Sequence, residues 1–195
     1  MTKYILHGGY TSTDNFDNNT FFEEITRDLT GSQLILLNYF SREKNEYEKL
    51  AKQDSDRILK HSINKDLQFE IADPDQLTEQ LGRANVMYMR GGDTALLLNL
   101  LRQTPDLPKL FMGKVIAGSS AGAYALVKYS WDWNKEVEGV RPGLGLLPLK
   151  IICHYTEARR PNLVKLSQIE EDLPILKLAD FKWAVFYIWR EIHAV

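Results

Sequence analysis

Residues 115–123 read Val115-Ile116-Ala117-Gly118-Ser119-Ser120-Ala121-Gly122-Ala123. The pattern Gly-x-Ser-x-Gly lies here between an apolar run, which predicts a strand over 114–117, and a segment that predicts a helix over 121–129. Glycines two residues on either side of a serine permit close packing at such a turn, while the hydroxyl is exposed. We therefore expect Ser120 to be a nucleophile and the N–H of Ala121 to be an oxyanion donor. A turn that merely lets a helix pack on a sheet would have the same composition.

Short apolar runs alternate with longer amphipathic segments along the rest of the chain. The apolar runs predict strands over 4–7, 33–38, 67–72, 85–89, 146–153 and 183–192. The segments between them predict helices over 20–29, 43–62, 94–102 and 162–170. One more helix is expected to begin at Asp73 as its cap, with Pro74 in the first turn. This order favours an α/β fold with a mostly parallel sheet and helices on both of its faces.

Length and composition bound the class of protein. The chain has 195 residues, about one domain, and no repeat or linker divides it, so we expect a single domain over 1–195. Its 24 Lys and Arg are interleaved with 26 Asp and Glu, which argues against a nucleic-acid partner. The single cysteine, Cys153, leaves no internal disulfide and no cysteine-rich metal site. No apolar stretch has the length of a membrane span or of a signal peptide. We expect a cytoplasmic protein that contacts no membrane and needs no metal or organic cofactor.

A nucleophilic serine needs a base, and the chain offers four histidines. His154 follows the predicted strand 146–153, and the carboxyl ends of strands in an open α/β sheet gather where ligands bind. His7 has a similar place after the first strand, beside Gly8-Gly9, but a structural role is expected for it. His61 and His193 are expected on the surface. His154 is therefore the candidate base, with Cys153 beside it as a core residue.

The base in turn needs a carboxylate that fixes its tautomer. Three acids lie between Ser120 and His154, namely Asp132, Glu136 and Glu138. Chain order does not choose among them, and each could equally be a solvated loop acid.

Two further stretches could complete a site. In the segment 90–94, Arg-Gly-Gly-Asp-Thr, the N–H groups of Gly91 and Gly92 could approach a substrate atom and complete an oxyanion hole; a tight strand-to-helix turn is the plainer interpretation. The pair Arg159-Arg160 follows His154 closely and could clamp a substrate carboxylate, although a solvated charge pair is more common.

These motifs, taken in order, resemble the peptidase E family of serine peptidases over nearly the whole chain. The resemblance is carried by 4–9 (Tyr-Ile-Leu-His-Gly-Gly), 88–94 (Tyr-Met-Arg-Gly-Gly-Asp-Thr), 117–123 (Ala-Gly-Ser-Ser-Ala-Gly-Ala) and 144–148 (Leu-Gly-Leu-Leu-Pro) leading to 153–155 (Cys-His-Tyr). It implies the flavodoxin-like three-layer sandwich shared with class I glutamine amidotransferases. In this family a serine stands where the amidotransferases have a cysteine, as Ser120 does here.

The resemblance also implies roles for individual residues. It makes Ser120 the nucleophile, His154 the base, and the backbone of Gly91, Gly92 and Ala121 the oxyanion hole. Alignment backward from His154 places Asp132 at the position of the family's third triad member, with Glu136 and Glu138 as the alternatives. The segment 154–161 is shorter than in peptidase E and lacks its Gly-Glu-Thr-Arg pattern, which is associated with preference for an amino-terminal aspartate.

The sequence thus predicts a serine hydrolase that cleaves small peptides through an acyl-enzyme. Two alternatives remain: a catalytically silent glutaminase-like domain that binds a small metabolite or a partner, and an α/β-hydrolase esterase, whose sheet needs more strands before Ser120 than the pattern provides. The oligomeric state is left open, a homodimer included.

Overall fold

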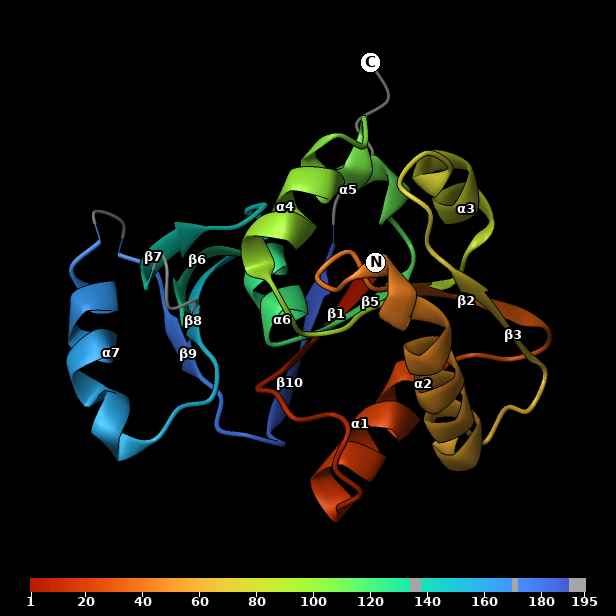
Figure 1. Cartoon of the computed structure of the whole chain (residues 1–195), viewed down its shortest axis with the longest axis horizontal. Coiled ribbons are helices and arrows are strands. Elements are labelled where there is room, and N and C mark those ends of the chain that lie inside the picture. The colour runs from red at the N-terminus through yellow and green to blue at the C-terminus, as the bar shows by residue number, and fades with distance from the viewer. Residues whose placement is uncertain (134–137, 170–171, 190–195) are drawn as a thin grey trace.

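The computed structural model describes residues 1–133, 138–169 and 172–189. Its larger sheet has six strands in the order β10-β1-β5-β4-β2-β3 (Figure 1). These strands are β1 (Thr2–His7), β2 (Gln33–Asn38), β3 (Leu67–Ile71), β4 (Val86–Met89), β5 (Val115–Ser119) and β10 (Trp183–Ile188). All of them are parallel except the edge strand β10, which pairs antiparallel with β1.

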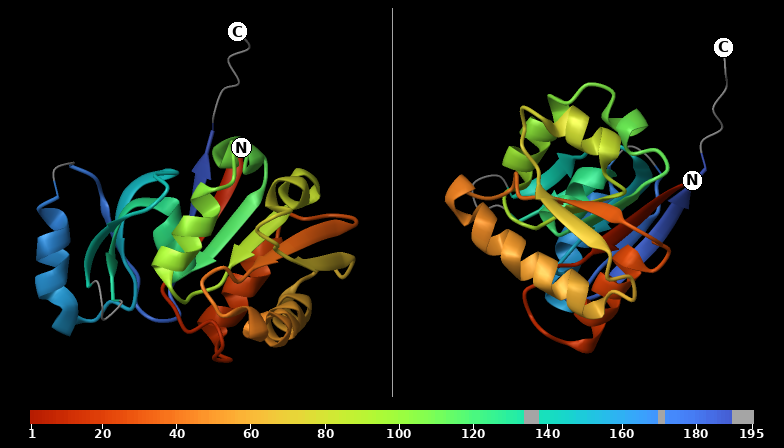
Figure 2. Two further views of the ribbon diagram at one scale, coloured as in Figure 1. Left: turned by 45° about the horizontal axis from the view of Figure 1, so that its top comes forward. Right: turned by 90° about the vertical axis from the view of Figure 1, so that its right-hand side faces the viewer.

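Helices cover both faces of this sheet (Figures 1 and 2). The helices α1 (Phe16–Thr26) and α2 (Tyr47–His61) pack on one face; α3 (Leu77–Arg83), α4 (Thr94–Arg102), α5 (Leu107–Leu110) and α6 (Ala121–Leu126) pack on the other. Along β2, Ile35 and Leu37 face the first pair, whereas Leu36 faces the second group. Burial on both faces explains why the run 33–38 is apolar throughout rather than alternating. The expected mostly parallel sheet with helices on both faces is confirmed.

A second, smaller sheet was not expected. It contains β6 (Val127–Asp132), β7 (Gly139–Pro142), β8 (Leu147–Ile152) and β9 (Ile175–Lys177) in the order β7-β6-β8-β9. The helix α7 (Arg160–Ser167) covers its outer face, where Leu166 packs on Trp131 and Ile152. The predicted helix over 121–129 is therefore wrong beyond Leu126, because the β-branched and aromatic side chains that follow favour a strand.

Two helix starts differ from the expectation. The helix α3 begins at Leu77 rather than at Asp73. The carboxylate of Asp73 accepts a hydrogen bond from the N–H of Asp75 at 2.9 Å, which closes a local turn instead of capping a helix. Short 3-10 turns precede two other helices, η1 (Lys44–Glu46) before α2 and η2 (Glu157–Arg159) before α7.

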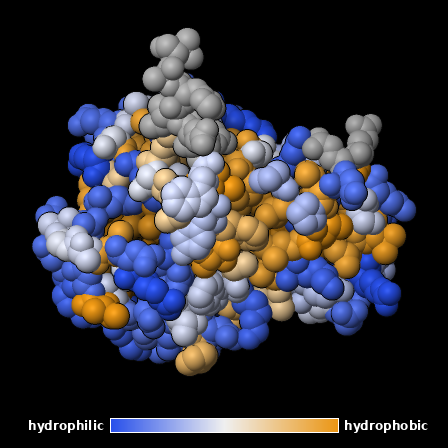
Figure 3. Space-filling model, turned by 180° about the vertical axis from the view of Figure 1, so that it is seen from behind, coloured by the Kyte–Doolittle hydropathy of each residue, from blue (hydrophilic) through white to orange (hydrophobic). Residues whose placement is uncertain are grey.

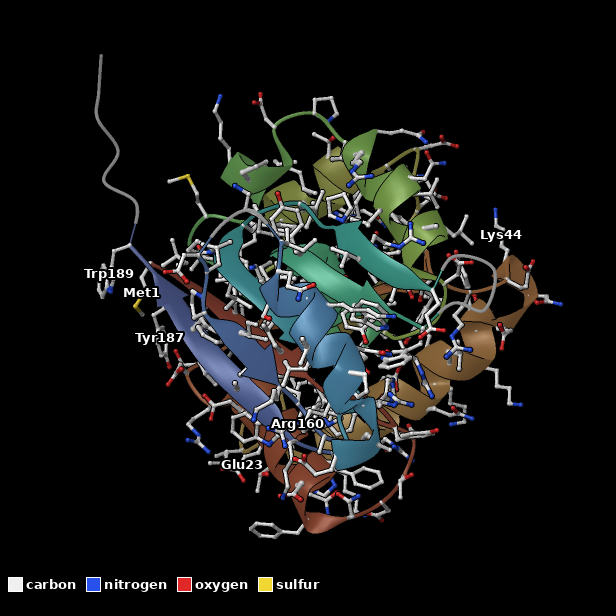
Figure 4. All side chains as sticks on the ribbon, turned by 90° about the vertical axis from the view of Figure 1, so that its left-hand side faces the viewer. Met1, Glu23, Lys44, Arg160, Tyr187 and Trp189 are labelled. Carbon is white, nitrogen blue, oxygen red and sulfur yellow. The ribbon has the colours of Figure 1, made fainter. Side chains whose placement is uncertain are left out.

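The surface at the β10 edge carries exposed apolar side chains. Figure 4 shows Tyr187 and Trp189 beside Met1 on the outer side of this strand, with 47%, 77% and 56% of their surfaces exposed. Seen from behind, apolar side chains form a band across the middle of the molecule between polar regions (Figure 3).

No helix in the described part of the chain is both apolar enough and long enough to span a membrane.

The turn between β5 and α6 depends on two glycines that lie in close contact with backbone. A Cβ on Gly118 would come within 2.4 Å of the carbonyl carbon of Gly122, and a Cβ on Gly122 would come within 2.4 Å of the carbonyl oxygen of Met89. Since backbone atoms form these contacts, no side-chain rotation can relieve them. The two glycines thus fix α6 against β5 and β4.

We predict that Gly118→Ala lowers the free energy of unfolding by about 1–3 kcal/mol, because the added methyl group overpacks this turn. Gly82→Ala is the matched control. Gly82 lies in α3 with no atom within 4 Å of its would-be Cβ, so alanine should raise stability there by up to about 1 kcal/mol. Urea denaturation of both variants measures the difference; equal effects would contradict the packing argument.

Candidate active site

Ser120 lies at the sharp turn between β5 and α6, as expected. Its backbone has φ 50° and ψ −106°, a conformation that residues with a side chain rarely adopt. The N–H of Ser120 donates to the carbonyl of His7 at 2.9 Å, and its carbonyl accepts from the N–H of Tyr124 at 2.8 Å. These two bonds hold the strained residue, so that its hydroxyl faces the pockets at the carboxyl ends of the strands.

A chain of hydrogen bonds joins three side chains at this point. Ser120 Oγ lies 2.9 Å from Nε2 of His154, and Nδ1 of His154 lies 2.6 Å from Oδ1 of Asp180. A carboxylate accepts only, so Nδ1 carries the proton and Nε2 is left to accept from the serine hydroxyl. This arrangement has the geometry of a nucleophile, a base and a carboxylate that orients the base.

The ring of His154 fits against a glycine of the loop after β1. A Cβ on Gly9 would come within 2.0 Å of Cε1 of His154, so a side chain at this position would collide with the imidazole. The N–H of His154 donates to the carbonyl of Gly8 at 3.1 Å, and the ring of Tyr10 meets the imidazole edge-on at 5.3 Å between centroids. The Gly8-Gly9 pair therefore makes room for the imidazole.

The same glycines seat the turn that carries Asp180, between β9 and β10. The N–H of Phe181 donates to the carbonyl of Gly9 at 3.2 Å, and the N–H of Gly8 donates to the carbonyl of Lys182 at 2.8 Å. A Cβ on Gly8 would come within 2.0 Å of the carbonyl oxygen of Ala179. The sequence reasoning missed Asp180 because it sought acids only between Ser120 and His154. The available signal was an acid in the turn just before the predicted strand 183–192.

Among the acids favoured by the sequence, Asp132 lines a pocket together with Ser120 and His154, but its carboxylate is bound to another residue. Oδ2 of Asp132 pairs with Nε of Arg141 at 2.5 Å, across the β6–β7 pair. Glu138 accepts a hydrogen bond from Asn162 at 3.2 Å, and Glu136 is outside the described residues. The placement of Asp132 on the imidazole is therefore corrected: a long-range turn supplies that carboxylate, and Asp132 has its ion pair with Arg141.

The loop between β4 and α4 lies directly beside Ser120, where a Cβ on Gly91 would come within 3.1 Å of the serine Cβ. Ser41 Oγ donates to the carbonyl of Arg90 at 2.9 Å, and Nε of Arg42 donates to the carbonyl of Gly91 at 2.6 Å. In a trans peptide the N–H points opposite to the carbonyl. The N–H groups of Gly91 and Gly92 are thus directed away from residues 41–42.

Arg159 and Arg160 do not reach the pockets beside Ser120. The guanidinium of Arg159 stacks on the ring of Trp133 at 4.0 Å. Arg160 is exposed at the start of α7 (Figure 4). Neither residue is among the described residues that line the two pockets. Cys153 is fully buried, and burial raises the pKa of its thiol, which agrees with the expected core role.

Two pockets flank the pair Ser120 and His154, and both residues line each of them. The first, named the basic pocket, extends to Arg42 and Arg90 and has a volume of about 420 Å³. The second, named the aromatic pocket, extends to Trp133 and has a volume of about 360 Å³. A substrate that places a carbonyl at Ser120 could therefore extend to both sides.

A family model described as peptidase family S51 matches residues 5–191. The chain belongs to peptidase family S51. It is therefore a serine peptidase of the peptidase E type, as the ordered motifs indicated. A comparison with curated proteins finds no match.

Solved structures agree with this S51 assignment at the level of the fold. A peptidase from an acI-B1 actinobacterium superposes with a TM-score of 0.68 at 18% identity, covering 95% of this chain and 83% of that one. A Listeria monocytogenes EGD-e protein named for peptidase E superposes with a TM-score of 0.64 at 18% identity, covering 95% of this chain and 94% of that one. The α/β architecture of this S51 chain, with mostly parallel sheets flanked by helices, is consistent with the class I glutamine amidotransferase-like fold.

His7 supports the site from within the core. Nδ1 of its imidazole accepts from the N–H of Gly9 at 3.0 Å, and Nε2 lies 2.9 Å from Oδ1 of Asn18. The ring is fully buried, and this burial lowers the pKa of His7 to about 4. His7 is thus neutral at physiological pH and holds Gly9 in place, in agreement with the expected structural role.

We predict that this neutral, buried imidazole makes stability fall as the pH drops from about 6.5 to about 4. Over this range the unfolded chain binds a proton at His7 and the folded chain does not. The free energy of unfolding therefore falls by about 3 kcal/mol. His7→Gln should be less stable than the parent at pH 7, and that difference should shrink by about this amount at pH 4. Urea denaturation at several pH values measures it. His61→Gln, at the end of α2, should change the pH dependence much less than His7→Gln, because this imidazole is only partly buried, although burial lowers its pKa as well. Parallel curves for His7→Gln and the parent would contradict the prediction.

Proposed function

We propose that this S51 peptidase hydrolyses short peptides through Ser120, with His154 as the base and Asp180 as the carboxylate that orients it. The observation that carries the proposal is the unbroken chain from Ser120 Oγ to His154 Nε2 at 2.9 Å and from His154 Nδ1 to Asp180 at 2.6 Å. Each distance is within the hydrogen-bond reach that proton transfer requires.

In the proposed reaction, Ser120 Oγ attacks the scissile carbonyl while Nε2 of His154 takes the hydroxyl proton. Asp180 stabilises the imidazolium that forms. The N–H groups of Gly91, Gly92 and Ala121 are the proposed donors to the oxyanion, and none of them has a hydrogen-bond partner among the described residues. His154 then gives the proton to the leaving amine. Water enters, and the same base activates it to release the acyl group from Ser120.

The two pockets support a small peptide as the substrate. Their volumes, about 420 and 360 Å³, are at the low end of the range for small-molecule sites. One pocket would receive the residue that is acylated, and the other would receive the leaving residue. A dipeptide or a similarly short peptide matches a pair of subsites of this size.

The alternatives from the sequence are less well supported. A silent glutaminase-like domain would have no need of a serine and an imidazole at 2.9 Å with a carboxylate on the far nitrogen. An α/β-hydrolase esterase does not agree with membership of family S51. The single domain over 1–195 and the cytoplasmic location stay predictions, and the oligomeric state stays open, a homodimer included.

We predict that a fluorophosphonate probe labels the parent chain and not Ser120→Ala, because the probe reacts with an activated serine hydroxyl. Ser119→Ala is the matched control: its hydroxyl is buried in β5, 3.4 Å from Nδ1 of His7, and this variant should be labelled like the parent. Intact-mass spectrometry measures the label. Equal labelling of the parent and Ser120→Ala would remove the assignment of Ser120.

We predict that Asp180→Asn lowers kcat by about 10³- to 10⁴-fold, because the amide would favour the wrong imidazole tautomer. Asp132→Asn should lose much less activity than Asp180→Asn. Glu138→Gln is the surface control, and its kcat should match that of the parent. The measurement is a dipeptide panel with and without an amino-terminal acidic residue, together with the rate of fluorophosphonate labelling. A larger loss in Asp132→Asn than in Asp180→Asn would return the third role to Asp132.

A further inference from the structure

We propose that Arg42 and Arg90 form a carboxylate-binding subsite in the basic pocket beside Ser120, an inference that rests on the proposed peptidase function. A peptide can supply the carboxylate in two ways: as the α-carboxylate of the leaving residue or as an acidic side chain near the scissile bond.

Arg90 presents part of a buried guanidinium to this pocket. Its Nη1 pairs with Oδ1 of Asp54 at 2.9 Å, and the two side chains are 9% and 1% exposed. The other oxygen of Asp54 accepts from the hydroxyl of Tyr39 at 3.0 Å. Within the described chain nothing bonds to Nε or Nη2 of Arg90, yet neither atom is among the buried polar atoms without a partner. These N–H groups therefore reach the pocket that Arg90 lines.

Arg42 contributes a second guanidinium to the same pocket. Its Nε donates to the carbonyl of Gly91 at 2.6 Å, which fixes the plane of the group against the loop beside Ser120. Both terminal nitrogens of Arg42 are without a hydrogen-bond partner in the parts of the chain that the structure describes. The two arginines thus offer free N–H groups from neighbouring segments, one after β2 and the other after β4.

No described carboxylate lines the basic pocket to neutralise these cations. Asp54 lies behind Arg90, and Asp180 is bound to the far nitrogen of His154. The remaining lining groups are backbone, hydroxyl groups and the imidazole of His154. A planar guanidinium binds a carboxylate through two parallel N–H donors. A carboxylate is therefore the substrate group that best complements the pocket.

Two side chains of helix α2 hold residues that line the basic pocket. Asp54 and Arg57 lie three residues apart on α2, so they share one face of the helix. Asp54 holds Arg90, and Arg57 donates to the carbonyls of Thr11 and Ser12, which line the same pocket. Burying an ion pair costs desolvation energy that stability alone rarely repays. The buried pair instead places the cation of Arg90 beside Ser120, where it can bind an anionic group of a ligand.

The test measures the binding of succinate and its neutral analogue succinamide to the Ser120→Ala chain by ligand-observed NMR. We expect the Ser120→Ala chain to bind succinate more tightly than succinamide. Adding Arg42→Met should weaken succinate binding by at least about tenfold and leave succinamide binding unchanged. Arg90→Lys retains a cation for Asp54 while removing the guanidinium donors, so it should weaken succinate binding as well. Arg160→Met, which removes an exposed cation on α7, is the control and should change neither affinity.

A second arm distinguishes the two sources of the carboxylate. In the active chain, a preference for a free carboxyl terminus over a carboxyl-terminal amide identifies the α-carboxylate, and a preference for an amino-terminal Asp over Asn identifies an acidic side chain. In Arg42→Met, the KM of the preferred substrate should rise, so that the preference is lost.

The outcomes separate this inference from the proposed function. Succinate binding that is no tighter than succinamide binding, or that is unaffected by both Arg42→Met and Arg90→Lys, overturns the subsite. Unlabelled Ser120 in the fluorophosphonate experiment overturns the peptidase mechanism, yet the succinate result remains valid because that chain has no nucleophile.

Discussion

The close approach of three chain segments at Gly8-Gly9 is the constraint on which the active site depends. The imidazole of His154 and the carbonyl of Ala179 each occupy space that a Cβ on this pair would fill, at 2.0 Å in both cases. The contact joins the end of β1 to residues that follow β8 and β9, so it connects the larger sheet to the smaller one. This contact places the imidazole of His154 and the carboxylate of Asp180 relative to one another.

Features with a local pattern could be predicted from the sequence, whereas the long-range contact at Gly8-Gly9 could not. The run 33–38 and the segment 94–102 were predicted with the bounds that β2 and α4 have, because their hydrophobic patterns are local and strong. Ser120 and His154 could be proposed from the sequence for a similar reason, because each follows an apolar run. Asp180 depends on a turn that reaches Gly8-Gly9 across most of the chain, and no local pattern records that contact. The strand β6 was missed because the chain passes from α6 into it with no Gly or Pro between them.

The ion pairs of this molecule differ widely in how far they are exposed to solvent. The exposed ion pairs, such as Lys52 with Asp56, add little to stability because water screens them. The pair of Arg90 and Asp54 is nearly sealed from solvent, and Arg90 lines the basic pocket beside Ser120. The aromatic pocket on the other side of Ser120 has a different chemistry, with the ring of Trp133 and the carboxylate of Asp132. The two pockets beside Ser120 therefore differ in electrical character, and under the proposed function this difference would orient a bound peptide.

The edge strand β10 has a consequence for how the site is assembled. It pairs with β1, and the turn just before it carries Asp180, so the first strand of the fold is joined by its last. During synthesis, Ser120 and His154 are therefore made before Asp180, whose carboxylate bonds to Nδ1 of His154 in the folded chain. The hydrogen-bonded group of these three side chains can form only after the turn before β10 has been made, although two of its members lie much earlier in the chain.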